Sequence, residues 1–234
     1  MGGVCSALTA PPLSPFEAKC LKAIQNQAAA NLDKLKNASL GSVLRKFGHW
    51  RFFFEQCKKV FEEYDGNKSN TLDLKELQAC ATQLKVVPTG MSIEESFREV
   101  DVDNTNDLNF GEFLLYLVTV NMVNSETQNV AASINWEEPV SDESPESMEG
   151  ISRALTVVVM AWTLLDGNSN GYISKRETLA VATQGHQNRQ VDIDLAEKLF
   201  KGLDADGNGN VSFKEFTLGF QCLQDYNMAH LDTL

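Results

Sequence analysis

One twelve-residue pattern occurs four times in the chain, as DGNKSNTLDLKE at residues 65–76, DVDNTNDLNFGE at 101–112, DGNSNGYISKRE at 166–177 and DADGNGNVSFKE at 204–215. We refer to these segments as the first, second, third and fourth loops. Each begins with Asp, ends with Glu and has an oxygen-bearing side chain at positions 1, 3, 5 and 9. A single Asp-rich segment can be an ordinary turn between helices. Four copies with one spacing predict four equivalent binding loops.

The alternation of oxygen-bearing positions suits a Ca²⁺ ion, which takes six to eight oxygen ligands at about 2.3–2.6 Å. Positions 1, 3 and 5 supply side-chain oxygens, position 7 a backbone carbonyl, position 9 a contact through water, and the Glu at position 12 both its oxygens. That Glu lies at the start of the next helix, so metal binding is coupled to the orientation of the helix. The predicted ligand residues are Asp65, Asn67, Ser69, Thr71, Asp73, Glu76, Asp101, Asp103, Thr105, Asp107, Asn109, Glu112, Asp166, Asn168, Asn170, Tyr172, Ser174, Glu177, Asp204, Asp206, Asn208, Asn210, Ser212 and Glu215.

The sixth position of such a loop makes a sharp turn that needs a positive φ angle. Gly171 and Gly209 occupy this position in the third and fourth loops, whereas Asn70 and Asn106 occupy it in the first two. Because Asn adopts a positive φ more easily than other non-glycine residues, we expect all four loops to fold. The third loop has only two acidic ligands and the others have three each, so we expect the third site to be the weakest.

The loops are flanked by apolar residues at helical spacing, which predicts a helix on each side of a loop. The loops begin 36 residues apart in the first pair and 38 in the second, with 65 between the pairs. We therefore predict an all-α fold of two lobes, each a pair of helix–loop–helix units joined by a short β-bridge at position 8, with an N-terminal helical extension. The predicted boundaries are 1–49 for the N-terminal arm and helix, 50–122 for the first lobe, 123–149 for an acidic linker, 150–226 for the second lobe and 227–234 for a tail. The aliphatic residues at position 8 are Leu72, Leu108, Ile173 and Val211.

The charge of the chain excludes some classes of partner. The net charge is −12, divided into +6 over residues 1–60 and −18 over the remainder. A body this acidic argues against nucleic acid as a partner. No run of 18 apolar residues is present, which excludes a membrane-spanning helix. The five cysteines are scattered and form no CxxC pair, which favours a reducing, intracellular compartment.

The chain resembles the four-EF-hand calcium sensors of the calmodulin superfamily, and most of all plant and algal calmodulin-like proteins with an acylatable N-terminus. Besides the loops, the resemblance lies in MGG at the start, SVLRKF at 42–47, CKKVFEEYD at 57–65 and ELQAC at 76–80. It implies a soluble regulatory protein that lacks catalytic activity. From the four loops we expect up to four Ca²⁺ ions, at sites that Mg²⁺ can also occupy at rest. The chain is also similar to neuronal calcium sensors and calcineurin B-like proteins, but its intact first loop and its long insertion at 121–150 differ from theirs.

The N-terminus carries a lipidation signal, because the first six residues fit the myristoylation pattern M-G-x-x-x-[ST]. We expect a myristoyl chain on Gly2 and a palmitoyl chain on Cys5, since stable anchoring needs two signals. These would hold the protein on the cytoplasmic face of a membrane. Residues 16–36 have the pattern of an amphipathic helix, which could lie on a membrane, occupy a groove of the same molecule or cover core. We favour packing within the molecule because the helix is not strongly basic.

No arrangement of residues predicts an enzyme. The three histidines His49, His186 and His230 are far apart, and the chain has no phosphate-binding glycine loop. We expect a monomeric sensor that binds a helix of an unknown target protein, with a calcium buffer or a regulatory subunit of a kinase or phosphatase as alternatives. Trp136 stands apart in the acidic linker, where it either packs on a lobe or docks a regulatory segment.

Overall fold

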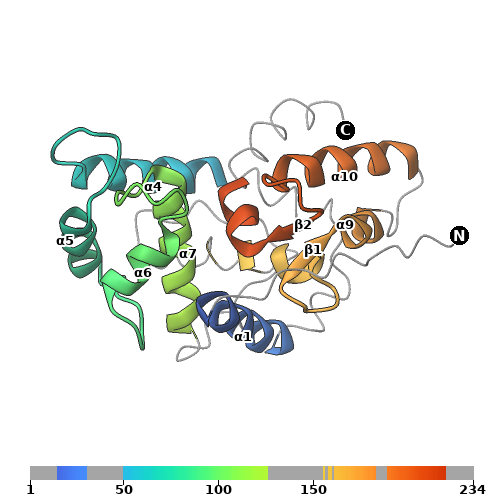
Figure 1. Cartoon of the computed structure of the whole chain (residues 1–234), viewed down its shortest axis with the longest axis horizontal. Helices are drawn as coiled ribbons and strands as arrows, with labels where there is room; N and C mark the ends of the chain where they lie inside the picture. Colours follow the sequence, from blue (N-terminus) through green and yellow to red (C-terminus); the bar gives the residue numbers. More distant parts are fainter. Residues whose placement is uncertain are drawn as a thin grey trace, which may run out of the picture.

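The computed structural model describes residues 15–30, 50–125, 155, 158–159, 161–182 and 189–219, and they form helices joined by loops and one small sheet (Figure 1). This confirms the predicted all-α class. Residues 161–165 and 213–219 are also helical. The elements are α1 (Pro15–Ala30), α4 (Trp50–Tyr64), α5 (Leu74–Leu84), α6 (Ile93–Val100), α7 (Phe110–Ser125), β1 (Tyr172–Ser174), α9 (Lys175–Ala182), α10 (Arg189–Leu203) and β2 (Asn210–Ser212).

The aliphatic residues at position 8 join the loops in pairs, as predicted. Leu72 and Leu108 form an antiparallel bridge in which each backbone N–H donates to the carbonyl of the other at 2.8 Å. In the second pair β1 and β2 are antiparallel, with Ile173 opposite Val211. All four side chains are fully buried. Each bridge therefore fixes two loops to each other and to the core beneath them. We call α4–α7 with their loops the N-terminal lobe, and residues 161–219 the C-terminal lobe.

Local sequence signals start the short helices of the N-terminal lobe. Asp73 precedes α5, and its carboxylate accepts hydrogen bonds from the N–H groups of Lys75 and Glu76. The carboxylate of Glu76 accepts the N–H of Asp73 in return, which makes a capping box. Ser92 and Glu95 form a second capping box at the start of α6. In the first loop, positions 9 and 12 therefore begin the helix as well as serving as predicted ligands.

The central helix α7 is apolar on all sides. Leu114 and Leu115 are both buried although they point in different directions from the helix axis, and the same holds for Tyr116 and Val118. A helix that is hydrophobic all round must be surrounded by other elements. Figure 1 shows α7 on the side of the N-terminal lobe that faces the other lobe. Among the described residues, no helix is long and apolar enough to cross a membrane.

Helix α1 packs inside the molecule, as we expected for residues 16–36. Phe16, Cys20, Ala23 and Ile24 are each no more than 5% exposed. They occur at helical spacing and so form one buried face. Figure 1 shows α1 beneath the junction of the two lobes. Residues 31–36 of the expected helix lie outside the described residues.

The two lobes also touch each other directly. The ammonium group of Lys214 lies 3.9 Å from a carboxylate oxygen of Glu99. This ion pair joins the fourth loop to α6. A Cβ atom added to Gly111 would lie 3.2 Å from a methyl group of Leu218. Buried residues of both lobes and of α1 belong to one hydrophobic cluster. The described residues therefore share a single core rather than one core for each lobe.

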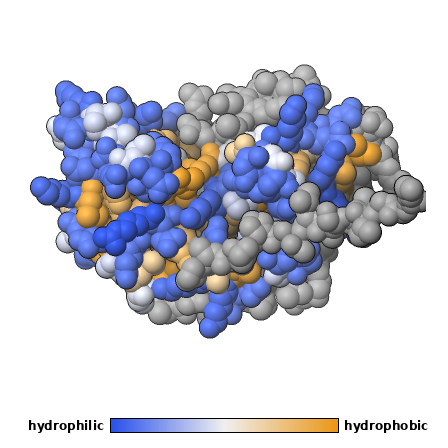
Figure 2. Space-filling view, in the orientation of Figure 1, coloured by the Kyte–Doolittle hydropathy of each residue, from blue (hydrophilic) through white to orange (hydrophobic). Residues whose placement is uncertain are grey.

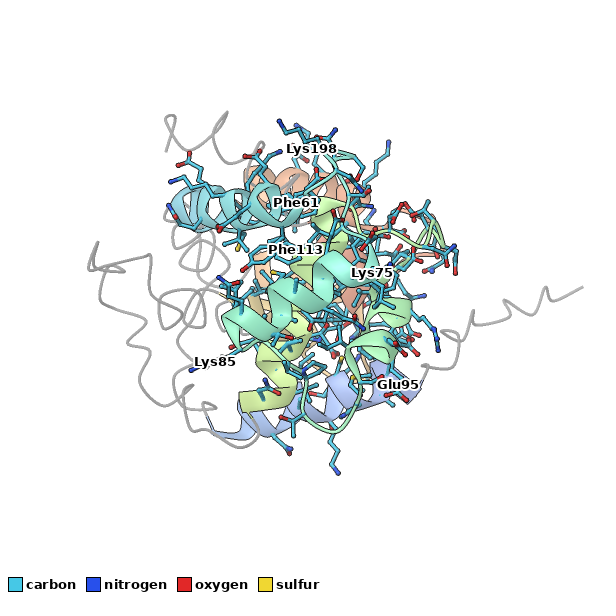
Figure 3. All side chains as sticks on the ribbon, turned by 90° about the vertical axis from the view of Figure 1, so that its left-hand side faces the viewer. Phe61, Lys75, Lys85, Glu95, Phe113 and Lys198 are labelled. Carbon is cyan, nitrogen blue, oxygen red and sulfur yellow. The ribbon has the colours of Figure 1, made fainter. Side chains whose placement is uncertain are left out.

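Aromatic side chains fill the interior of each lobe. The rings of Phe61 and Phe113 lie 5.6 Å apart, and Figure 3 shows both between the helices, whereas Lys85, Glu95 and Lys198 point outward. In the C-terminal lobe the ring of Trp162 lies 5.2 Å from that of Phe213. Figure 2 shows a mainly hydrophilic face, with hydrophobic side chains gathered over part of the N-terminal lobe.

Several sequence-based expectations fall outside the described residues. These include both lipidation sites and most of the acidic linker. The outer parts of the predicted domain boundaries lie there as well. The residues and ranges concerned are Gly2, Cys5, Trp136, 1–14, 31–49, 126–154 and 220–234.

The buried thiols give a first testable prediction. Burial raises the pKa of Cys20 and of Cys80 to about 12, and burial also raises the pKa of Cys57. Because the thiolate is the reactive form, we expect these thiols to react with a disulfide reagent at pH 8 at least about a hundredfold more slowly in the folded protein than in denaturant. The measurement uses a Cys5→Ser, Cys222→Ser background. A thiol that reacts equally fast in both states would show that the helices α1, α4 and α5 do not pack as described.

Candidate metal centre

The Asp at position 1 organises each loop through its carboxylate. In the first loop, the two oxygens of Asp65 accept the N–H groups of Ser69 at 2.9 Å and Asn70 at 2.8 Å. These bonds bend the backbone round the carboxylate. The same pair of bonds recurs from Thr105 and Asn106 to Asp101 and from Asn170 and Gly171 to Asp166, and Gly209 donates to Asp204.

The Glu at position 12 reaches back into its loop in all four copies. One oxygen of Glu76 accepts the N–H of Gly66 at 3.0 Å and the other accepts that of Asp73 at 3.0 Å. The last predicted ligand therefore lies inside the loop and ties its two ends together. The corresponding bonds run from Val102 and Asn109 to Glu112, from Asn168 and Ser174 to Glu177, and from Ala205 and Ser212 to Glu215.

In the first two loops the backbone carbonyl at position 7 accepts a hydrogen bond from the hydroxyl at position 5. The hydroxyl of Ser69 donates to the carbonyl of Thr71 at 3.1 Å. In the second loop, the hydroxyl of Thr105 donates to the carbonyl of Asp107 at 3.0 Å. Positions 5 and 7 therefore lie within hydrogen-bond distance of each other, so that one cation could contact both.

The sharp turn at position 6 is confirmed in every loop. Asn70 and Asn106 both have φ of 63°, and Gly171 and Gly209 have φ of 87° and 83°. The Asn residues thus take the conformation that glycine takes elsewhere.

Sequence reasoning missed a second left-handed residue, at position 4. Lys68, Asn104, Ser169 and Gly207 have φ of 57°, 56°, 55° and 69°. Asn104 and Gly207 favour this conformation and gave a signal in two loops. Nothing about Lys or Ser indicates a positive φ, so the feature could not be recognised in the first and third loops.

Three carboxylates converge in the second loop and again in the fourth. The members of each set, Asp101, Asp103 and Glu112 or Asp204, Asp206 and Glu215, offer oxygens within 4.8 Å of one another. Such a spacing is unfavourable without a cation, because like charges repel. In the part of the chain that the structure describes, Asp204 Oδ1 is buried and has no hydrogen-bond partner. A buried orphan oxygen beside two other carboxylates fits a hard divalent cation.

Among the described residues, the first and third loops do not bring three carboxylates this close together. In the first, the carboxylate of Asp73 accepts N–H groups of α5 at 2.8 and 2.9 Å, so it caps that helix. Whether position 9 contacts an ion through water stays a prediction. In the third, Asp166 and Glu177 are the two acidic ligands, and the hydroxyl of Ser174 donates to Glu177 at 2.7 Å.

Burial works against charge on two of these ligands. It raises the pKa of Glu112 and the pKa of Asp166, even though backbone N–H groups oppose the shift. On the exposed Asp103 the hydrogen bond from the hydroxyl of Thr105 lowers the pKa. A cation in the loop would favour the ionised form of the buried carboxylates.

The loops and their helices match a known family. A family described as an EF-hand domain pair matches residues 54–117 and 156–221. Two similar proteins from Arabidopsis thaliana are named "Probable calcium-binding protein CML21", 25% identical over 89% of this chain and 84% of its own, and "Probable calcium-binding protein CML22", 23% identical over 78% and 76%. A troponin C isoallergen from Blattella germanica is 26% identical over 68% of this chain and 86% of its own.

A glycine substitution tests the left-handed turn. Gly209 has φ of 83°, and a Cβ atom there would meet nothing within 4 Å, so Gly209→Ala changes only the backbone preference. We expect a loss of about 1–2 kcal/mol of unfolding free energy in the presence of chelator. The measurement is denaturant unfolding. Gly167→Ala is the matched control, because it has equal space and no positive φ, and its stability should be unchanged or slightly higher. Equal effects of the two substitutions would contradict the conformation.

Proposed function

The chain belongs to the EF-hand domain-pair family, and from this membership we propose that it is a calcium sensor that binds up to four Ca²⁺ ions and then engages a target protein. The observation that carries the proposal is the common geometry of the four loops. In each loop the carboxylates of positions 1 and 12 both lie inside the loop and are held by its own backbone N–H groups. Side chains held by backbone hydrogen bonds lose little conformational freedom when they bind a cation, which favours binding.

Positions 1 and 12 of each loop have different roles in binding. Position 1 fixes the start of the loop and position 12 fixes the start of the next helix, so a contact to both draws the helix toward the loop. Both carboxylate oxygens of this Glu would coordinate a bound Ca²⁺. Mg²⁺ demands a smaller octahedral shell, so we expect it to occupy sites at rest without the same bidentate contact.

The paired loops should respond together. Leu72 and Leu108 exchange two backbone hydrogen bonds at 2.8 Å, and Ile173 faces Val211 in the other lobe. A shift of one loop therefore moves its neighbour through a buried contact. This favours cooperative binding within each lobe.

A calcium buffer is the second candidate function. Phe61, Leu77, Phe97 and Phe113 are each at most 5% exposed and belong to the core shared by both lobes. A sensor must expose such residues on binding, whereas a buffer hardly opens. The continuous core favours the buffer, and the lipidation signal favours the sensor, because a buffer needs no address. A regulatory subunit of a kinase or phosphatase would bind its enzyme through the apolar surface that a sensor exposes on opening. In none of these roles does the protein act as an enzyme.

We further propose that the protein is a monomer on the cytoplasmic face of a membrane and has no nucleic-acid partner. The support is the myristoylation pattern at Gly2 with Cys5 beside it. The −18 charge beyond residue 60 is repelled by anionic lipid, so the acyl chains must offset this repulsion. Four bound Ca²⁺ would add eight positive charges and weaken it.

Stoichiometry tests the four sites. We expect calorimetry to detect four Ca²⁺ in the unmodified protein, with affinities of about 10⁻⁷–10⁻⁵ M if it is a sensor. Glu76→Gln, Glu112→Gln, Glu177→Gln and Glu215→Gln should each remove one ion, because one bidentate ligand is lost. Glu95→Gln, on α6 and outside the loops, is the control and should retain four. Two ions or fewer in the unmodified protein would contradict the proposal.

Opening distinguishes the sensor from the buffer. If the lobes open, Ca²⁺ should increase the binding of a hydrophobic dye several-fold and accelerate hydrogen exchange around Phe97 and Phe200, which are core residues in this structure. The control is Mg²⁺ alone at the same molar concentration, which adds the same charge. Identical dye binding and exchange in chelator and in excess Ca²⁺ would reject the sensor and leave the buffer.

Membrane attachment is tested by expression in cells followed by fractionation and acyl labelling. We expect the unmodified protein in the membrane fraction, Cys5→Ser partly released and Gly2→Ala fully released, because one acyl chain binds only reversibly. An unmodified protein that carries no label and is as soluble as Gly2→Ala would refute the membrane proposal.

A further inference from the structure

Helix α1 lies against the third loop. The side-chain amide of Gln25 donates to the backbone carbonyl of Ser169 at 3.1 Å. Ser169 is the position-4 residue with φ of 55°. Next to this bond, side chains of α1 and the C-terminal lobe surround a small cavity. Its lining residues are Glu17, Leu21, Ile24, Trp162, Gly171 and Phe213. Both left-handed residues of the third loop thus adjoin α1.

The same helix is held at its other side by the N-terminal lobe. The ammonium group of Lys19 donates to the carbonyl of Thr89 at 3.1 Å and lies 3.5 Å from that of Gly90. The ammonium group of Lys214, from the C-terminal lobe, lies 5.6 Å from the centre of the Phe16 ring. The position of α1 relative to the third loop is therefore fixed by contacts on both lobes.

The third loop has the greatest need of outside support. It has two acidic ligands where the other loops have three. Its position 4 is Ser, which is disfavoured at positive φ, as is Lys68 in the first loop, but the first loop has three acidic ligands. A hydrogen bond to the Ser169 carbonyl and packing beside Gly171 both stabilise the wound form of the loop. In that form Asp166 and Glu177 are already turned inward.

We propose that α1 is an affinity-determining element of the third loop: its docking raises the affinity of this loop for Ca²⁺. By reciprocity of coupled equilibria, Ca²⁺ in the third loop tightens the docking of α1 between the lobes. The N-terminal helix α1 then joins the two lobes through contacts that bound Ca²⁺ strengthens. This inference rests on the proposed binding of Ca²⁺ at the third loop.

The test compares positions on α1 that face the loop with one that does not. Gln25→Ala removes the bond to Ser169 without opening the core, since Gln25 is exposed, and Ile24→Gln disturbs the buried contact. Lys22→Ala is the matched control, on an exposed position of the same helix. The amide of Gly171, which donates to Asp166 at 3.0 Å, reports the third loop in an NMR titration with Ca²⁺. The amide of Gly209, which donates to Asp204, reports the fourth.

We expect the Gly171 transition to move to at least about fivefold higher Ca²⁺ in Ile24→Gln, the lower end of typical coupling. Gln25→Ala should move it in the same direction by about twofold or more, and Lys22→Ala should not move it. The Gly209 transition should move less than that of Gly171. Identical Gly171 transitions in Gln25→Ala, Ile24→Gln and Lys22→Ala would overturn the inference.

Two further measurements separate the inference from its premise. In a Glu177→Gln background, which removes the third site, Gln25→Ala should leave the remaining isotherm unchanged, and an equal shift there would overturn the inference. Hydrogen exchange of the α1 amides should slow when Ca²⁺ is added to the unmodified protein but not to Glu177→Gln, and unchanged exchange in both would also overturn it. If Gly171 does not respond to Ca²⁺ in the unmodified protein, the four-site proposal fails and the inference fails with it.

Discussion

The structure depends on the hydrogen bonds that the position-12 carboxylates accept from the backbone of their own loops. Glu76 shows the consequence, because it joins Gly66 at the start of the loop to Asp73 at the start of α5. A residue that begins a helix is thereby tied to the end of the preceding one. The bridge between Leu72 and Leu108 extends this tie to the second loop. The helix directions, and through them the core, follow from where four carboxylates are held.

The shared core sets a limit on how far calcium can open the molecule. At a concentration 100 times Kd, one bound ion stabilises the binding-competent form by about 2.7 kcal/mol. Exposing one fully buried Phe costs roughly 1.5–3 kcal/mol. Two ions in a lobe can thus offset the exposure of only a few side chains such as Phe97 and Phe113. Wider opening requires a target surface that covers them again, so calcium and target should bind with positive cooperativity.

The sequence predicted the parts of this arrangement that repeat. Regular spacing identified the four loops, the aliphatic bridge at Ile173 and Val211 and the buried helix faces, because each is a local consequence of a repeated pattern. It did not predict the left-handed Lys68, whose side chain carries no preference for that conformation. The sequence also did not predict contacts between distant segments, such as that of Gln25 with Ser169 and that of Lys214 with Glu99. Periodicity shows which face of a helix is buried but not which surface covers it.

The central claim is that the carboxylates of each loop converge on one Ca²⁺ ion. A crystal structure grown with Ca²⁺, with anomalous diffraction data, tests it most directly. The account predicts an anomalous peak in every loop, with both oxygens of Glu76, Glu112, Glu177 and Glu215 at about 2.3–2.6 Å from it. Absence of a peak from the second and fourth loops, where three carboxylates lie together, would contradict the account.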